Sequence, residues 1–128
     1  MSVVPGKSGQ KYIEETHSKM TRLNSILKEH HFSGYIEADG GVNLENIGSI
    51  FADGARVFVG GGAIIGQQDV RSAIRDFRNE VLKSRRRILL NKANELGGVD
   101  LVKKWIGLHV VGEKQDQIKK IAMEVGYL

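Results

Sequence analysis

The chain has 128 residues, a formal net charge of +4 and no cysteine, and 41% of its residues are hydrophobic. This length permits one compact core, and the composition excludes a disordered chain, a disulfide framework and a thiolate metal site. The N-terminal residues MSVVPGKSGQ carry no targeting signal, and no apolar run approaches the ~18 residues that a membrane span needs. We therefore expect a soluble, cytoplasmic protein without a membrane partner.

The positive charge is concentrated in the C-terminal part of the chain. Residues 1–70 contain six Lys and Arg against eight Asp and Glu, whereas residues 71–128 contain thirteen against seven. The two parts therefore carry formal charges of −2 and +6. Such a shift predicts a boundary near residue 70.

The N-terminal segment predicts a strand end, a loop and a helix. Residues 1–4 are β-prone, and Pro5 and Gly6 begin a polar loop that continues to Gln10. From residue 12 to about residue 30, apolar residues recur with helical spacing, and two glutamates fall in the first turn. This pattern predicts an amphipathic helix.

Two further pairs of strand and helix follow. Residues 35–38 and 56–59 are short apolar runs, and glycine-rich turns at residues 39–41 and 60–62 end them. We expect a helix after each of these strands, the first capped by Asn43 and the second opened by Asp69.

The order of strand, loop and helix occurs three times and predicts a parallel sheet with right-handed crossovers. Ligands of such sheets bind beyond the carboxyl ends of the strands, where each of these predicted strands ends in glycines. Tight turning explains a single glycine turn. Three in series favour an anion site, because backbone N–H groups without a neighbouring Cβ can approach a phosphate closely and helix N-termini favour negative charge.

Three motifs occur in the order and with the spacing of one protein family. Residues 1–10 look like its strand-six segment and its Pro-Gly-Phe-Gly-Gly-Gln loop, and residues 36–43 are similar to its strand-seven motif. Gly54-Ala55 with residues 57–59 and 61–64 resembles its strand-eight motif. The family is ribulose-phosphate 3-epimerase, a phosphate-binding (β/α)8 barrel.

The resemblance implies an α/β fold, because the family is a TIM barrel. A complete barrel has ~250 residues, so we expect a partial barrel of about three parallel βα units with extra C-terminal helices. Residues 1–85 would form the partial barrel, with strands six to eight, and residues 86–128 a basic helical extension. The chain is expected to be a truncated product or one half of an enzyme whose other half is a separate chain.

The family interconverts ribulose 5-phosphate and xylulose 5-phosphate in the pentose phosphate pathway, so the resemblance implies a sugar-phosphate ligand. Asp39 matches a strand-seven carboxylate that binds a divalent metal (Zn, Mn or Fe) and acts as one of two acid–base groups. Met1 matches a methionine that lines the reacting carbons. The positions that hold the substrate phosphate match Gly6, Lys7, Ser8, Gly9, Gly40, Gly41, Gly61 and Gly62.

The chain also departs from the family pattern. Lys7, Ser8 and Gly62 replace the usual Phe, Gly and Ser, and the first two retain donors for a phosphate. The family's second acid–base aspartate and its metal-binding histidines come from early strands that this chain does not match. Epimerisation removes a proton from one face and returns one to the other, so we expect phosphate binding without independent catalysis.

Other roles are open for the histidines and for Asp39. We expect His17, His30, His31 and His109 to face solvent or to lie at helix ends. An aspartate between a buried strand and a Gly-Gly turn often hydrogen-bonds the backbone amides that follow it. With the resemblance, an active-site position for Asp39 is favoured instead.

The C-terminal part allows an alternative function. The cationic run at residues 83–87 is compatible with a non-catalytic assembly or nucleic-acid-binding module, although interleaved acids and the lack of aromatic residues favour a solvated helix end. Three parallel strands leave two open edges, which promote pairing with other chains. We therefore expect a homo-oligomer or a complementary half-barrel chain as partner, and not a nucleic acid.

Overall fold

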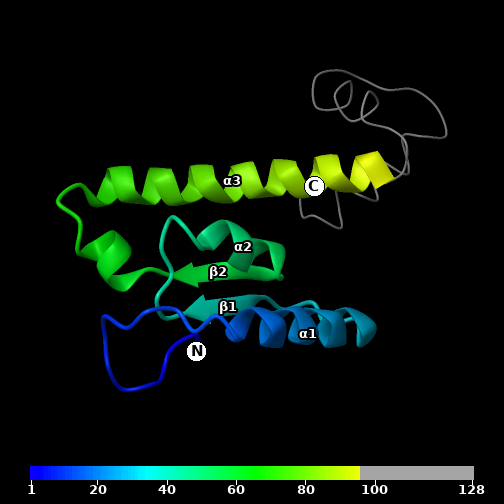
Figure 1. Ribbon diagram of the computed structural model, residues 1–128, viewed down its shortest axis with the longest axis horizontal. Helices are drawn as coiled ribbons and strands as arrows, with labels where there is room; N and C mark the ends of the chain where they lie inside the picture. The colour runs from blue at the N-terminus through cyan, green and yellow to red at the C-terminus, as the bar shows by residue number, and fades with distance from the viewer. Residues whose placement is uncertain (96–128) are drawn as a thin grey trace. The chain divides into compact units, whose positions relative to one another are not determined.

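The computed structural model describes residues 1–95 of the chain (Figure 1). In chain order its elements are α1 (Thr16–Glu29), β1 (Ile36–Asp39), α2 (Ile47–Ala52), β2 (Ala55–Val59), the π-helix η1 (Gly61–Ile65) and α3 (Val70–Glu95). The chain divides into two compact units, Met1–Ser84 and Arg85–Leu128, and the boundary falls within α3. No helix within residues 1–95 is both long enough and apolar enough to cross a membrane. The helices expected within residues 96–128, and His109, lie outside the described residues.

The sheet consists of β1 and β2, which run parallel with α2 between them in the chain. Ala38 is in register with Phe58 and Asp39 with Val59, so the two strands end side by side. Both strands lie within one residue of their predicted positions. The α/β class and the parallel crossover are therefore confirmed.

The prediction of a third strand at residues 1–4 is wrong, because this segment forms no strand. The Ser2 amide donates to the carbonyl oxygen of Asp39 at 2.8 Å, but the Ser2 carbonyl accepts from the amide of Ile13 at 2.9 Å instead of from β1. Pro5 then lacks an N–H, so the segment cannot continue a ladder along β1. Within residues 1–95 the sheet has two strands, and the structure shows a small α/β unit instead of three parallel βα units.

One face of the sheet packs against helices and the other is exposed. Ile36 and Ala38 of β1 are buried, and they belong to a core that includes Met20 of α1, Ile50 of α2 and Phe77 of α3. Successive strand residues point to opposite faces, so Glu37, Val57 and Val59 lie on the other side, with the valines 38% and 39% exposed. Burial of a side chain such as Ile50, which is fully inaccessible, contributes roughly 1.5–3 kcal/mol.

Only α3 begins where the sequence predicts. Helix α1 begins at Thr16, four residues after the predicted start at residue 12, and its first turn contains no acidic residue. The Oδ1 atom of Asp69 accepts a hydrogen bond from the Ser72 amide at 2.9 Å, which is the N-cap geometry predicted for α3. Asn43 instead opens the turn that precedes α2. Its Oδ1 accepts from the Asn46 amide at 3.1 Å, and the Oδ1 of Asn46 accepts from the Asn43 amide at 2.8 Å. This reciprocal pair works like a capping box and fixes where α2 begins.

The contact between α2 and α3 is polar at its centre. The Ser84 hydroxyl, which is buried, donates to the carbonyl oxygen of Gly48 at 2.7 Å. The bond satisfies a hydroxyl that would otherwise cost ~1–3 kcal/mol to bury. It thereby holds α3 on the helix that follows β1.

Candidate anion-binding site

A cavity of about 1040 Å³ lies at the carboxyl end of the sheet. Three loops line it: the N-terminal loop, the turn after β1 and the turn after β2. Every site residue predicted from the sequence lines this one cavity, namely Met1, Gly6, Lys7, Ser8, Gly9, Asp39, Gly40, Gly41, Gly61 and Gly62. The structure therefore brings together residues that lie up to 61 positions apart in the chain.

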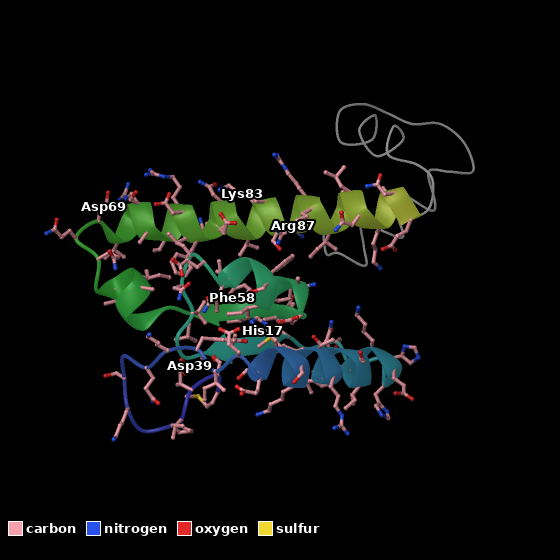
Figure 2. The ribbon with its side chains drawn as sticks, viewed as in Figure 1. His17, Asp39, Phe58, Asp69, Lys83 and Arg87 are labelled. Atoms are coloured by element: carbon pink, nitrogen blue, oxygen red, sulfur yellow. The ribbon has the colours of Figure 1, made fainter. Side chains whose placement is uncertain are left out.

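Asp39 is the last residue of β1 and is half-buried (Figure 2). Its carbonyl oxygen accepts from both the amide and the hydroxyl of Ser2, each at 2.8 Å. Its carboxylate has no hydrogen bond or ion pair with any other residue in the described range 1–95. The alternative role, in which this carboxylate binds the amides of the following turn, is therefore not found there. The carboxylate remains available to a ligand.

The turn after β1 requires glycine. Gly40 and Gly41 have φ angles of +116° and +67°, a region that other residues rarely adopt. A Cβ on Gly40 would overlap the side chain of Val3, and one on Gly41 would overlap the backbone of Tyr12. Asn46 also donates from Nδ2 to the Gly41 carbonyl at 3.0 Å. The turn is thus held on both sides.

The turn after β2 is different, because it faces open space. Gly61 and Gly62 begin η1, and a Cβ on either would have no atom within 4 Å. Neighbouring protein atoms therefore do not require glycine here. A ligand that approaches these amides closely would require it. The π-helix itself was not predicted, since the glycine run was expected only to end a strand.

The N-terminal loop is closed by Gln10, to which the sequence assigned no role beyond its place in a motif. Its side-chain amide donates to the carbonyl oxygens of Val4 at 2.6 Å and of Lys7 at 2.7 Å. Both donors of this amide are used to hold the loop in shape. Lys7 itself is exposed and lines the cavity.

The charges around the cavity are mixed. Lys7 and Lys11 supply two cations, and Glu14, Asp39 and Glu45 supply three carboxylates. A dianion would therefore have to lie near the lysines and the glycine amides, away from the carboxylates.

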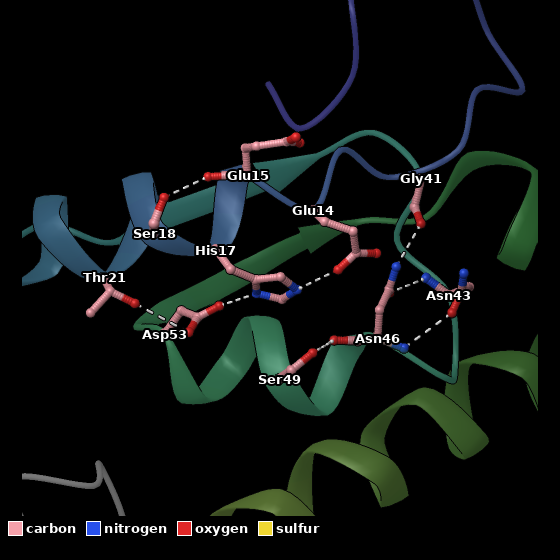
Figure 3. Close-up of polar contacts among 10 residues, drawn as sticks. All are labelled: Glu14, Glu15, His17, Ser18, Thr21, Gly41, Asn43, Asn46, Ser49 and Asp53. Atoms are coloured by element: carbon pink, nitrogen blue, oxygen red, sulfur yellow. Dashed lines mark hydrogen bonds and ion pairs between the residues drawn. The ribbon is translucent and has the colours of Figure 1, made fainter.

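His17 lies in the first turn of α1, so its predicted position at a helix end is confirmed. It does not face solvent, because it is half-buried and paired. Its Nδ1 atom bonds the Asp53 carboxylate, and its Nε2 atom lies 3.6 Å from the Glu14 carboxylate (Figure 3). His30 and His31 are exposed at the end of α1, as expected. The spacing to Glu14 is visible in the sequence, whereas the pairing with Asp53, 36 residues away, is not.

Tyr12 packs against His17, and both residues line the cavity. Its ring centroid is 5.0 Å from that of His17, and its buried hydroxyl has no hydrogen-bond partner within residues 1–95. Burial raises the pKa of Tyr12 to about 12, and the charges of Asp53 and Glu14 add to this effect. The phenol therefore stays neutral at all physiological pH values.

The described residues do not fit a metal ion by themselves. Residues 1–95 contain no group of three or more His, Asp or Glu side chains placed to hold one. Asp39 offers a single carboxylate, whereas catalytic zinc sites take three protein ligands. A zinc ion at this cavity would need ligands from elsewhere.

Comparison with known proteins identifies relatives of this chain. Residues 1–65 match the model of the ribulose-phosphate 3 epimerase family. The chain is 42% identical to a ribulose-phosphate 3-epimerase of Escherichia coli (strain K12) over 83 residues, which cover 65% of this chain and 37% of that protein. It is 36% identical to a ribulose-phosphate 3-epimerase of Methanocaldococcus jannaschii over 93 residues, or 73% of this chain and 40% of that protein.

A chloroplastic ribulose-5-phosphate-3-epimerase of Arabidopsis thaliana is 36% identical over 78 residues, which cover 61% of this chain and 28% of that protein. The chain thus matches well under half of the length of these curated relatives. The comparisons give no support to an assembly or nucleic-acid-binding role.

Proposed function

The chain belongs to the ribulose-phosphate 3-epimerase family, and on this premise we propose that its cavity binds the phosphate of ribulose 5-phosphate or xylulose 5-phosphate. One observation carries the proposal: ten residues selected from sequence motifs line a single cavity at the carboxyl end of the sheet. The open space before Gly61 and Gly62 leaves their backbone accessible to phosphate oxygens. Lys7 would add a charge-assisted bond, and the hydroxyl of Ser8 a further donor.

Asp39 is proposed as one of the two acid–base groups of the epimerisation. Its carboxylate is half-buried, lines the same cavity as the glycines and has no competing partner within residues 1–95. The reaction needs one group on each face of the reacting carbon, so Asp39 can remove or return the proton on one face only. We therefore propose that the described residues bind substrate, and that turnover needs a second acid–base group from elsewhere.

A metal ion would also need groups that residues 1–95 do not supply. Asp39 would be one ligand of a divalent Zn, Mn or Fe ion, and the remaining ligands would lie outside residues 1–95. Such an ion, when bound, would stabilise the oxyanion that develops as the proton leaves.

The exposed face of the sheet supports a partial barrel. Glu37, Val57 and Val59 lie on the side of β1 and β2 that no helix of residues 1–95 covers. The two valines are exposed on the same face, and apolar surface of this kind is better covered by protein. We propose that β1 and β2 are the seventh and eighth barrel strands and that residues 1–4 lie at the sixth. The complementary part of a barrel, or a second copy of the chain, would cover the exposed face. We propose that residues 1–85 form the partial barrel and residues 86–128 the extension.

Isothermal titration calorimetry with ribulose 5-phosphate tests the binding step. We expect binding by the wild-type chain and by Asp39→Asn, because the carboxylate does not hold the phosphate. Epimerisation is then measured after mixing with a polypeptide that comprises the remaining N-terminal part of the Escherichia coli relative. We expect turnover by the mixture and its loss in Asp39→Asn, whereas no binding by the wild-type chain would contradict the proposal.

A further inference from the structure

The Gly41 turn is connected to both ends of α2. Asn46 links it to the start of the helix, and Tyr12 and His17 link it to Asp53 at the end. On one side, the Asn46 side chain at the start of α2 donates to the Gly41 carbonyl at 3.0 Å. On the other side, Gly41 packs against the backbone of Tyr12 so closely that a Cβ would not fit. A shift of either neighbour must therefore move the turn.

The series continues from Tyr12 to the far end of α2. The Tyr12 ring lies at 5.0 Å and 48° to the His17 ring, and Tyr12 is buried, so its side chain and backbone are packed on both sides. The His17 ring is bonded through Nδ1 to Asp53, the residue that caps the C-terminus of α2. The hydroxyl of Thr21 also donates to Asp53, at 3.2 Å. Figure 3 shows His17, Asp53 and Thr21 at one end of α2 and Asn46 with Gly41 at the other.

Three groups surround the His17 ring: Glu14 from the segment before α1, Asp53 from the end of α2, and Tyr12 from the N-terminal loop. Each ring nitrogen faces one of the two carboxylates, and the ring face packs against Tyr12. Replacing this ring therefore removes both polar contacts and changes the packing of Tyr12.

We propose that His17 is a positioning residue whose contacts with Asp53 and Tyr12 set the geometry of the Gly41 turn and thereby the affinity of the cavity for phosphate. The inference rests on the proposed phosphate-binding function for its last step only. The mechanical link from His17 to Gly41 stands on the contacts alone.

The link is tested by comparing the backbone amide shift of Gly41, measured by NMR, in the wild type, in His17→Gln and in His30→Gln. We expect the Gly41 amide to shift in His17→Gln and not in His30→Gln, which changes an exposed histidine at the end of the same helix. The Gly62 amide, whose surroundings are open, is expected not to shift in either variant. A Gly41 amide that is unchanged in His17→Gln would overturn the proposal.

The effect on binding is measured with inorganic phosphate. We expect His17→Gln and Asp53→Asn to weaken phosphate binding about fivefold, the size typical of a residue that acts through another. Asp53→Asn serves if His17→Gln does not fold, and the matched control His30→Gln changes an exposed histidine at the end of the same helix. A purely structural histidine would lower thermal stability and leave the phosphate affinity unchanged.

The two proposals can fail separately. If the wild-type chain does not bind phosphate, the proposed function fails, and the Gly41 amide shift in His17→Gln alone decides whether His17 sets the turn. If the wild-type chain binds phosphate and both variants bind it with unchanged affinity, the positioning role is wrong and the proposed function stands.

Discussion

The two turns at the end of the sheet are both rich in glycine, but their glycines have different surroundings. The turn after β1 is enclosed: Val3 and Tyr12 occupy the space where Cβ atoms would lie, and both glycines have positive φ angles. The turn after β2 has nothing within 4 Å of a Cβ at Gly61 or Gly62. The fold requires glycine in the first turn, whereas only a ligand would require it in the second.

This difference separates the glycines that the fold requires from the glycines that are proposed to contact the ligand. Sequence alone treats Gly40, Gly41, Gly61 and Gly62 as one class, because each follows a strand and lines the predicted site. Substitutions in the two turns should therefore affect different quantities, stability in the first and affinity in the second.

Gly41→Ala is expected to have the largest effect. The new Cβ must enter the space of the Tyr12 backbone, which cannot rotate away, and the residue must keep a φ of +67°. Strain and overlap together should lower the free energy of unfolding by about 3 kcal/mol. Urea denaturation measures this change. A loss below ~1 kcal/mol would mean that the turn is not enclosed.

Ser2→Ala tests the hydrogen bonds that Ser2 makes to the turn after β1. The Ser2 hydroxyl is 1% exposed and lies 2.8 Å from the Asp39 carbonyl and 2.7 Å from the Gly40 carbonyl. Its removal leaves a buried carbonyl without this donor and should cost about 1.5 kcal/mol in urea denaturation. Exposed Ser18→Ala, in which the hydroxyl bonds only the local Glu15 carbonyl, is the control and should cost less than ~0.5 kcal/mol.

Gly62→Ala tests the open turn. Because the Cβ meets no protein atom, the free energy of unfolding should stay within ~0.5 kcal/mol of the wild type. The methyl group would occupy space in front of the amides, so phosphate affinity measured by calorimetry should fall about tenfold. Unchanged affinity would show that this turn does not contact the anion.

Tyr12→Phe is expected to have the smallest effect. The hydroxyl that is removed is buried without a partner within residues 1–95, so stability at pH 7 should be unchanged or rise by up to ~1 kcal/mol. The folded pKa of Tyr12 is raised to about 12 from its ordinary value of 10, so the folded state favours the neutral phenol. The stability that the raised pKa of Tyr12 contributes is fully present below pH 10 and is lost as the pH rises through 12. The free energy of unfolding, measured by denaturation between pH 9 and 12, should fall with rising pH in the wild type and fall less in Tyr12→Phe.

Much of this site could be predicted from sequence, because its residues follow directly after strands. Short apolar runs ended by glycines located β1 and β2 to within one residue, and the motifs identified ten of the residues that line the cavity. Local capping chemistry also located the start of α3 at Asp69. These features depend on near neighbours in the chain.

The features that sequence did not predict depend on distant partners. Residues 1–4 have a strand-like composition, but the Ser2 carbonyl pairs with Ile13 instead of β1. The short apolar run therefore forms no ladder. His17 has the sequence context of a solvent-facing histidine, and only the fold places Asp53 beside it. Whether the barrel is completed by other protein stays a proposal.

The convergence of the three loops on one anion is tested most directly by titrating the isotope-labelled chain with inorganic phosphate and following its glycine amides by NMR. We expect amides from the three loops, those of Gly9, Gly41 and Gly62, to shift together with one dissociation constant. Shifts confined to one loop, or different dissociation constants for the three, would contradict a single phosphate site at the end of the sheet.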